Sequence, residues 1–291
     1  MIDLTGRTAI VTGAGGGLGR SHALLLASRG ARVVVNDMGD SANAVVDEIH
    51  AAGWQARAAK CSVTDVEAVQ AMVDEVLADW GRIDILVNNA GILRDKSFAK
   101  MELADFRLVL DVHLMGSAHC TKAVWNPMRA QNYGRIVMTT SCSGLYGNFG
   151  QANYAAAKMG LVGLMQTLGI EGEKNNVRVN CLAPTGATRM MEGILPAHQL
   201  AQFKPELVSP AVLALVSENA PNRAILSAGA GGYELAYIAL TQGIALGEAA
   251  TAEQILARWD ELADRGDAFV PATGFDQARH ELRKAGFPLE A

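Results

Sequence analysis

A run of glycines near the N-terminus constrains the fold more than any other feature of the chain. The segment TGAGGGLG at 12–19 joins an apolar stretch at 8–11 to a segment at 18–29 that carries leucines at helical spacing and stops at Gly30. This order predicts a buried strand, a tight turn and a helix. Glycines let the backbone approach a phosphate, and a helix N-terminus supplies N–H donors and partial positive charge. The loop therefore indicates a dinucleotide site, although glycine-rich loops also serve as plain turns.

Strand-like and helix-like segments continue to alternate along the chain. This alternation predicts an α/β fold whose parallel sheet is covered by helices on both faces. A more polar tail follows, where Thr251 and Gln254 can form a capping box. We therefore expect one domain over 1–250 and a helical extension over 251–291. The expected strands lie near 8–11, 32–36, 55–61, 83–87, 135–139, 177–182 and 224–227, and the expected helices near 18–29, 41–52, 65–79, 103–130, 151–173, 206–217 and 251–264.

Composition excludes several classes of protein. The formal net charge is −5 over 291 residues, which argues against an electrostatic grip on nucleic acid or an anionic membrane. The four cysteines lie far apart without metal-ligand spacing, so we expect buried hydrophobic side chains in a reducing compartment, and no metal. The residues before the first strand lack the pattern of a signal peptide, so we expect none, and the apolar runs are too short to span a bilayer. We therefore expect a cytoplasmic protein without membrane insertion.

The end of the second expected strand indicates which dinucleotide binds. Asp37 stands there, and a carboxylate at that point can accept hydrogen bonds from both hydroxyls of an adenosine ribose while repelling a 2′-phosphate. The pattern favours NAD over NADP, and Arg32 at the start of the strand is poorly placed to reverse that choice. Alternatively, Asp37 is only a turn residue before Gly39. Asn88-Asn89-Ala90-Gly91 follows a later strand, where such sheets bind ligands, but it is also an ordinary loop sequence.

A tyrosine and a lysine four residues apart indicate the chemistry. In a helix, Tyr154 and Lys158 share one face. A phenol titrates near pH ~10, and a nearby ammonium or a positive nicotinamide ring favours the phenolate. Ser141 follows the strand at 135–139 and can hold a substrate oxygen beside the phenol, although Thr140 or Ser143 could be the donor instead. The three groups together predict proton transfer to or from a hydroxyl.

With these motifs together, the chain resembles the short-chain dehydrogenase/reductase superfamily over about residues 4–230. The resemblance implies a Rossmann-type doubly wound sheet of about seven strands, and members are commonly homodimers or homotetramers. It further implies Tyr154 as acid/base, Lys158 lowering the pKa of the phenol and holding the ribose, and Ser141 orienting the substrate oxygen. The cofactor contacts that it implies are Gly13, Gly15, Gly17, Leu18, Gly19, Asp37, Ser62, Val63, Asn89, Ala90, Gly91, Tyr154, Lys158, Pro184 and Gly186.

Two positions depart from the superfamily pattern. His113 stands where many members have an asparagine that anchors a water in the proton relay. It could hold that water or relay a proton itself, so we include it among the catalytic candidates, with a buried structural histidine as the alternative. Ser62 replaces the usual aspartate near the adenine and is expected to make the same contact less strongly.

One branch shows a nearer resemblance, carried by the segments 34–39, 112–117 and 144–154. These are similar to the (3R)-hydroxyacyl-CoA dehydrogenase domain of peroxisomal multifunctional enzymes and to related bacterial dehydrogenases. This resemblance implies an oxidoreductase of lipid metabolism that interconverts a (3R)-3-hydroxyacyl-CoA, or a similar lipophilic alcohol, and its ketone. A hydroxysteroid or a small alcohol stays open as substrate, and a non-catalytic NAD-binding regulator is the alternative of another class. A basic stretch could receive CoA phosphates or be a solvated loop, and an apolar stretch suggests a lid; these are Arg94, Lys96 and Lys100, and Met190, Met191, Ile194 and Leu195.

Overall fold

The chain folds into two compact units, residues 1–235 and 236–291. The structure is a computed structural model that describes residues 1–186 and 196–287. The division falls upstream of the boundary expected at residue 250, and the assignment of domains at 1–250 and 251–291 stays a prediction. The apolar lid suggested around Met190 to Leu195 lies outside the described residues.

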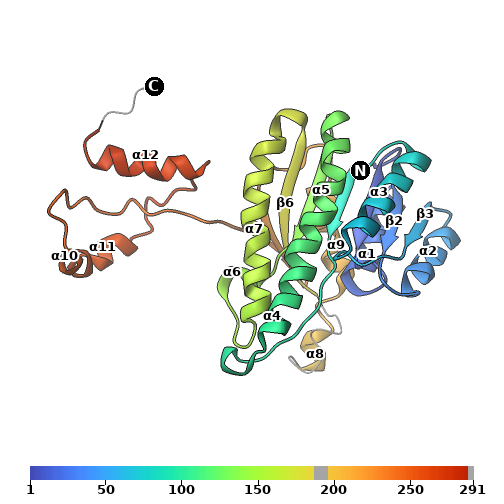
Figure 1. Ribbon diagram of the computed structural model, residues 1–291, viewed down its shortest axis with the longest axis horizontal. Coiled ribbons are helices and arrows are strands. Elements are labelled where there is room, and N and C mark those ends of the chain that lie inside the picture. Colours follow the sequence, from blue (N-terminus) through green and yellow to red (C-terminus); the bar gives the residue numbers. More distant parts are fainter. Residues whose placement is uncertain (187–195, 288–291) are drawn as a thin grey trace. The chain divides into compact units, whose positions relative to one another are not determined.

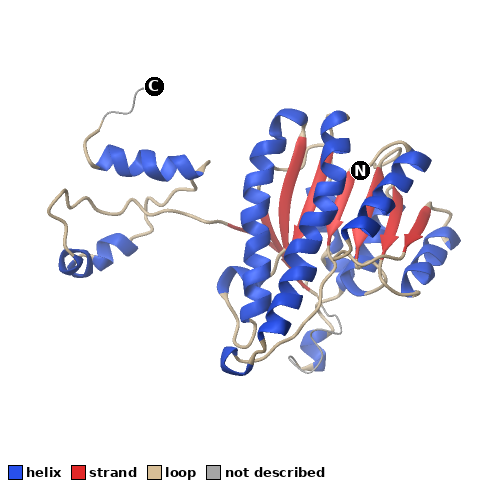
Figure 2. Cartoon of the chain, viewed as in Figure 1, coloured by secondary structure: helices blue, strands red, loops and turns tan. Residues whose placement is uncertain are grey.

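An eight-stranded sheet forms the centre of the first unit, in the order β3-β2-β1-β4-β5-β6-β7-β8. Figure 2 shows strands in red with helices in blue packed around them. The strands from β1 to β7 are parallel, as expected. β8 was not predicted, since it is a short, exposed edge strand without strong apolar alternation. It turns back after Ala230 and Gly231, whose positive φ angles of 49° and 84° suit a two-residue hairpin. The strands are β1 (Thr8–Thr12), β2 (Arg32–Asn36), β3 (Ala56–Ala59), β4 (Ile85–Asn88), β5 (Gly134–Thr139), β6 (Val177–Thr185), β7 (Ile225–Gly229) and β8 (Gly232–Ala236).

Helices cover both faces of this sheet. Ala9 and Val11 of β1 pack into a core with α1 (Gly17–Ser28), α2 (Ser41–Ala51) and α9 (Ser209–Leu215). Across the other face lie α3 (Val66–Trp80), α5 (Gly116–Ala130) and α7 (Ala152–Gly172) (Figure 1). Because the strands are buried on both faces, they read as continuous apolar runs. Short helices complete the unit: η1 (Phe98–Lys100), α6 (Cys142–Tyr146), η3 (Glu173–Asn175), α8 (Ala197–Leu200) and η5 (Pro205–Leu207).

The single helix expected over 103–130 is interrupted in its middle. α4 (Leu103–Leu110) runs into a π-helical turn, η2 (Asp111–Met115), before α5 begins. Such a turn adds one residue to a helical repeat, which an apolar period cannot reveal, and π-turns often occur at functional sites. This one contains His113.

The second unit contains three helices, α10 (Ala252–Ala257), α11 (Trp259–Ala263) and α12 (Gly274–Lys284). The capping box predicted at Thr251 and Gln254 is confirmed, with the Thr251 hydroxyl and the Gln254 side chain each accepting the other's backbone N–H. An antiparallel bridge joins Leu240 to Phe269. Across residues 1–186 and 196–287, no helix is long and apolar enough to cross a membrane.

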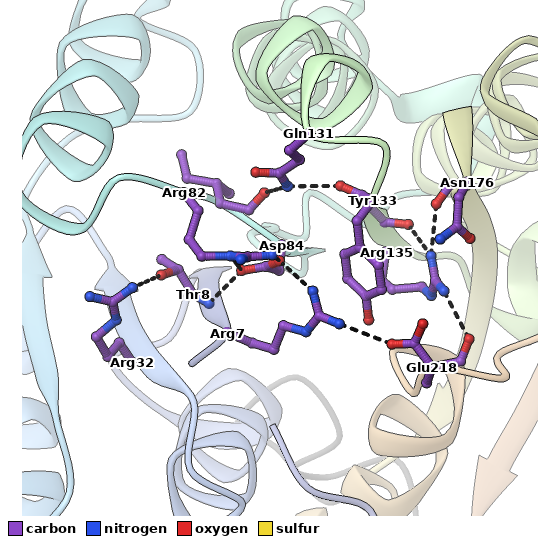
Figure 3. Close-up of polar contacts among 12 residues, drawn as sticks. Arg7, Thr8, Arg32, Arg82, Asp84, Gln131, Tyr133, Arg135, Asn176 and Glu218 are labelled. Carbon is purple, nitrogen blue, oxygen red and sulfur yellow. Dashed lines mark hydrogen bonds and ion pairs between the residues drawn. The ribbon is translucent and has the colours of Figure 1, made fainter. Parts of the chain in front are cut away.

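A buried carboxylate fixes the amino edge of the sheet, opposite the edge that carries the site. Asp84 accepts from the Thr8 N–H at 2.9 Å, from Arg7 at 3.0 Å and from Arg82 at 2.8 Å (Figure 3). The guanidinium groups of Arg7 and Arg135 lie 3.7 and 4.2 Å from the centre of the Tyr133 ring. These contacts tie the starts of β1, β4 and β5 together.

The cysteines depart in part from expectation. All four are free thiols, and Cys120 and Cys181 are buried as predicted. Cys61 is half-buried, and Cys142 is exposed because it begins the short helix α6.

Candidate active site

Two loops meet where the strand order reverses, at the carboxyl ends of β1 and β4. In doubly wound sheets ligands bind in the crevice at this point. Gly13 has a φ of +63°, and a Cβ there would stand 2.7 Å from the Ala90 Cα. The glycine loop after β1 and the Asn88–Gly91 loop after β4 therefore touch, and only glycine fits at the contact.

Asn89 and Thr12 fasten these loops together. The Asn89 amide donates to the carbonyls of Thr12 and Gly13 at 3.0 and 3.1 Å. The Thr12 hydroxyl accepts from the N–H groups of Asn89 and Ala90, both at 3.0 Å. Asn89 and Ala90 therefore hold the start of the glycine loop in place through hydrogen bonds to Thr12 and Gly13.

Asp37 lies beside the glycine loop, as the expected ribose contact requires. Its carboxylate accepts from the Gly15 N–H at 3.0 Å and from the Met38 N–H at 2.8 Å. The Arg32 guanidinium donates to the Thr8 hydroxyl and the Trp80 carbonyl at the far end of β2. An acidic side chain, a glycine cradle and the start of α1 thus fit a dinucleotide that has free ribose hydroxyls.

The other expected cofactor contacts border this cradle. Gly17, Leu18 and Gly19 form the first turn of α1, and Leu18 packs against Gly186 just after β6, where a Cβ would stand 2.8 Å from the Leu18 Cδ2. Pro184 is the second-to-last residue of β6 and lies opposite Ala228 of β7.

Ser62 and Val63 lie between β3 and α3. The Ser62 hydroxyl accepts from the Thr64 N–H at 3.2 Å and is 2.8 Å from the Thr64 hydroxyl, so it is engaged in a local turn. Val63 is buried, and its carbonyl lies 3.0 Å from the His119 Nδ1.

The structure brings Ser141, Tyr154 and Lys158 together. Ser141 is buried at the start of α6, where its hydroxyl accepts from the Ser143 N–H at 3.2 Å, and it lies near enough to the Tyr154 phenol to lower the pKa of that group. Lys158, 3 % exposed, lies one turn below with its Nζ 5.5 Å from the centre of the phenol ring and donating to the Thr139 carbonyl. The Thr140 hydroxyl donates to the Lys158 carbonyl at 2.7 Å, so Thr140 holds α7 and is not free to bind a substrate oxygen.

Burial decides the protonation of this pair. It raises the pKa of Tyr154, against the lowering effect of the Ser141 hydrogen bond. It lowers the pKa of Lys158 to about 7. The direction for Tyr154 differs from the lowering expected beside an ammonium, because the dry surroundings disfavour both charges. The phenolate therefore needs further positive charge in the pocket, such as an oxidised nicotinamide ring supplies.

His113 lies beside the phenol, in the π-helical turn. Its ring meets that of Tyr154 edge-on, with centroids 5.2 Å apart. Nε2 lies 2.7 Å from the Ile92 carbonyl oxygen and 3.0 Å from the Ile92 nitrogen, so Ile92 serves either tautomer. Burial lowers the pKa of His113 to about 3, with Lys158 acting in the same direction. His113 is therefore a neutral imidazole, whose buried Nδ1 has no partner among residues 1–186 and 196–287.

Gly91 contacts this histidine as well as lying in the cofactor loop. A Cβ at Gly91 would stand 2.9 Å from the His113 Nδ1 and 3.1 Å from Nε2. The absence of a side chain at Gly91 thus makes room for the imidazole.

Sequence reasoning missed a polar cluster in front of Tyr154. Asp95 accepts from the Gln151 amide at 2.6 Å, and the Asn153 amide donates to the Arg94 carbonyl at 3.0 Å. The available signal was the pair of amides in Gln151-Ala152-Asn153, directly before the tyrosine. Within the described part of the chain, no group of three or more His, Cys, Asp or Glu side chains is arranged to hold a metal ion.

Comparisons with known proteins agree with this geometry. The sequence profile of short chain dehydrogenases matches residues 7–198. The chain is 47 % identical over 278 residues to peroxisomal multifunctional enzyme type 2 of Drosophila melanogaster, covering 90 % of this chain but only 46 % of that enzyme. The solved full-length structure of that enzyme has a TM-score of 0.85, at 41 % identity, over 98 % of this chain and 50 % of its own.

Two further proteins match the chain over most of their own length. A short-chain type dehydrogenase/reductase of Mycobacterium tuberculosis is 43 % identical over 91 % of this chain and 96 % of its own. A 7α-hydroxysteroid dehydrogenase, solved with NADH and 7-oxo glycochenodeoxycholic acid, is 33 % identical with a TM-score of 0.73, over 79 % of this chain and 95 % of its own.

Proposed function

The chain belongs to the short-chain dehydrogenase family and is an oxidoreductase, and from this premise we propose that it interconverts a secondary alcohol and a ketone with NAD(H). The observation that carries the proposal is that Ser141, Tyr154 and Lys158 lie together at the same sheet edge as the glycine loop, with the Lys158 Nζ 5.5 Å from the centre of the Tyr154 ring.

Each side chain has a role in the proposed reaction. When bound, NAD(H) supplies the hydride acceptor or donor. Ser141 holds the substrate oxygen, and the Tyr154 phenol oxygen takes the hydroxyl proton in oxidation and returns it in reduction. Lys158 holds the nicotinamide ribose and favours the phenolate when it is protonated. His113 stays neutral; it offers a hydrogen-bonding nitrogen and packs edge-on against the phenol ring.

We propose NAD as the cofactor because of what surrounds Asp37. Its carboxylate is fixed beside the glycine loop by the Gly15 and Met38 N–H groups. A 2′-phosphate would meet a negative charge there, and residues 36–39 carry no basic side chain. Gly13 to Gly19, Ser62, Val63, Asn89 to Gly91, Pro184 and Gly186 would border the cofactor.

We propose a (3R)-3-hydroxyacyl-CoA, or a similar lipophilic alcohol, as the substrate. The resemblance to the multifunctional enzymes supports it, although the chain spans about half the length of the Drosophila relative. The similarity to a dehydrogenase solved with a bile-acid ketone favours a hydroxysteroid as the second candidate. The basic loop supports CoA only weakly, because Arg94 and Lys96 lie 3.9 and 3.6 Å from Asp105.

Assembly and location are proposed on narrower grounds. Met159 and Ile170 of α7 are 39 % and 43 % exposed, and such apolar groups on a long helix support a homodimer or homotetramer. A cytoplasmic location stays our proposal, and the peroxisomal relatives make the peroxisome its competitor. Light scattering and cell fractionation test the two points.

The decisive experiment follows NADH absorbance with matched hydroxyacyl-CoAs, hydroxysteroids and simple alcohols. We expect NAD-dependent turnover with a lipophilic alcohol and a loss of at least about a hundredfold in Tyr154→Phe, the scale of general acid–base catalysis. Cofactor binding, followed by NADH fluorescence, should survive in that variant. Undiminished turnover in Tyr154→Phe would remove the proposed role, and no turnover with any alcohol would favour a non-catalytic NAD-binding protein.

A further inference from the structure

Tyr154 lies in the first turn of α7, where the backbone makes the fewest hydrogen bonds within the helix. The first N–H groups of a helix have no partner within it, so a side chain at the N-cap usually accepts from one of them. Gln151 is the N-cap residue here, and its side chain makes no such bond. Within the helix, the Asn153 side chain accepts from the Tyr154 N–H at 2.8 Å, and further contacts from outside the helix hold the turn that carries the acid/base.

Those contacts come from the loop that follows β4. The Gln151 amide donates to the Asp95 carboxylate at 2.6 Å, and the Asn153 amide donates to the Arg94 carbonyl at 3.0 Å. The Lys96 N–H donates to the Gly150 carbonyl at 2.9 Å. Gln151 and Asn153 are 8 % and 0 % exposed, whereas Arg94 and Asp95 are exposed, so these part-buried bonds join a buried helix start to a surface loop.

The same loop reaches Tyr154 from a second direction. Ile92, at the start of the loop, holds the His113 imidazole through its carbonyl and N–H groups, and His113 meets the phenol ring edge-on. The loop begins directly after Gly91 of the cofactor crevice. One short segment, residues 92–96, thus contacts both His113 and the first turn of α7, the two elements that hold the phenol.

We propose that Asp95 is a positioning residue for Tyr154, acting through Gln151. The Asp95–Gln151 bond fastens the loop after β4 to the first turn of α7 and so fixes the phenol against Ser141. A bond from a buried amide to a carboxylate is stronger than a neutral pair, which suits it to this task. The neighbouring charges of the loop are engaged elsewhere, since Arg94 and Lys96 face Asp105. The inference rests on the proposed function, in which Tyr154 is the acid/base, and it names Asp95 as a residue that holds Tyr154 in place.

Four variants of the full chain, with a fifth as control, separate this role from a merely structural one. Asp95→Ala should lower kcat about tenfold through misplacement of the phenol, while KM for NAD changes less than about twofold. Asp95→Asn keeps an acceptor oxygen and should stay within about threefold of wild type. Gln151→Glu opposes two carboxylates and should resemble Asp95→Ala, whereas Asp95→Asn combined with Gln151→Glu reverses donor and acceptor and should restore turnover. Asp105→Asn, which changes another carboxylate near the loop, is the matched control.

Hydrogen exchange gives a readout that needs no substrate. Amides of residues 152–158 should exchange about tenfold faster in Asp95→Ala than in wild type or Asp105→Asn, because the first turn opens more often. Turnover unchanged in Asp95→Ala, or lowered without rescue by Asp95→Asn, overturns the assignment. If the wild-type chain turns over no alcohol, the proposed function is wrong. In that case hydrogen exchange still tests the Asp95–Gln151 bond, and an exchange rate in Asp95→Ala equal to that of wild type overturns its role in holding the first turn.

Discussion

The imidazole of His113 stands edge-on to the phenol of Tyr154, with ring planes at 89° and centroids 5.2 Å apart. This contact depends on the π-helical turn Asp111–Met115, which carries His113, and on Ile92, which holds its Nε2. Edge-to-face contacts of this kind fix the orientation of a ring in addition to burying it. A neutral histidine ring thus packs against Tyr154 at the position where many members of the superfamily have an asparagine.

The first prediction concerns His113 and pH. Its pKa of about 3 means that the ring is neutral throughout the range from pH 5 to 9. His113→Phe keeps the ring contact but removes both nitrogens, and we expect kcat to fall about tenfold, the scale of one lost hydrogen-bonding group. The shape of the pH profile of kcat should be unchanged, as steady-state rates at fixed NAD will show. An acid limb that is present in wild type and missing in His113→Phe would show that His113 titrates.

The second prediction concerns Lys158 and stability. Its folded pKa of about 7 lies below the ordinary value of 10.5, so the native state binds fewer protons than the unfolded state between those limits. Burial of Lys158 therefore costs most stability below pH 7, and the cost disappears as pH rises toward 10.5. We expect Lys158→Met to stabilise the cofactor-free protein by roughly 1–3 kcal/mol at pH 6, with a gain that shrinks by pH 9.5. Urea unfolding at the two pH values measures the difference.

Activity supplies the control for Lys158→Met. The variant should lose turnover while it gains stability, because the ammonium is needed beside the phenol. A variant that is less stable at pH 6 than wild type would indicate that the bond from Lys158 to the Thr139 carbonyl outweighs the burial cost.

The third prediction concerns the choice of cofactor. Asp37→Ser combined with Met38→Arg removes the carboxylate and adds a cation beside the glycine loop. We expect kcat/KM for NAD to fall about a hundredfold and that for NADP to rise, since one close charge contact is worth roughly 2–3 kcal/mol. Rates with both cofactors measure the ratio. Asp40→Ser is the control, because Asp40 pairs with Lys60 at the surface and not with the glycine loop. Unchanged discrimination in the double variant would refute the role of Asp37.

Much of this site follows from local sequence, and the rest does not, for a physical reason. Tyr154 and Lys158 were predictable because a helix brings residues four apart onto one face, and Asp37 because it ends a β-branched strand. The Asp95–Gln151 bond joins residues 56 apart, and nothing local in either segment reports the other. Contacts between loops depend on the register of whole elements, which a single sequence does not express.

Some elements of the fold were likewise predictable from local sequence and others were not. The central strands β1, β2, β4 and β5 were predictable from apolar runs, since strands buried on both faces leave a strong signal, whereas the edge strand β3 is half-buried throughout. The edge strand β8 is exposed and leaves a weak signal. The helix α12 begins with a capping box between Thr273 and Asp276, a signal that sequence reasoning did not use. The π-helical turn around His113 shares its apolar residues with the helices on either side, so the expected helix over 103–130 had no visible interruption.

The fourth prediction concerns the amino edge of the sheet. Asp84 is fully buried with Arg7 and Arg82 as partners, and their side chains are 25 % and 39 % exposed. Asp84→Asn removes the counter-charge of Arg82 and leaves Arg7 with only the exposed Glu218, and we expect a loss of about 2 kcal/mol in the free energy of unfolding, less than for a fully enclosed pair. Glu218→Gln, whose side chain is 65 % exposed, should cost under about 0.5 kcal/mol. Chemical unfolding measures both, and KM values should not change. Equal losses in the two variants would contradict the ranking.

The last prediction tests whether Gly91 makes room for His113. A methyl group at Gly91 would stand 2.9 Å from the His113 Nδ1, closer than side chains tolerate, so Gly91→Ala must displace the imidazole. Displacement removes the edge contact with Tyr154, and we expect kcat to fall about tenfold or more, as for small misplacements of reacting groups.

A second-site change distinguishes this cause from damage to the cofactor loop, in which Gly91 also lies. His113→Ser shortens the side chain that collides with the new methyl group. If the collision is the cause, adding Gly91→Ala to His113→Ser should cost less than about twofold further in kcat, although Gly91→Ala alone costs tenfold. If Gly91 acts instead on the cofactor, the two losses multiply and the Kd for NADH rises in both backgrounds. Rates and NADH fluorescence titrations on the four members of the cycle decide between a contact with the histidine and a contact with the dinucleotide.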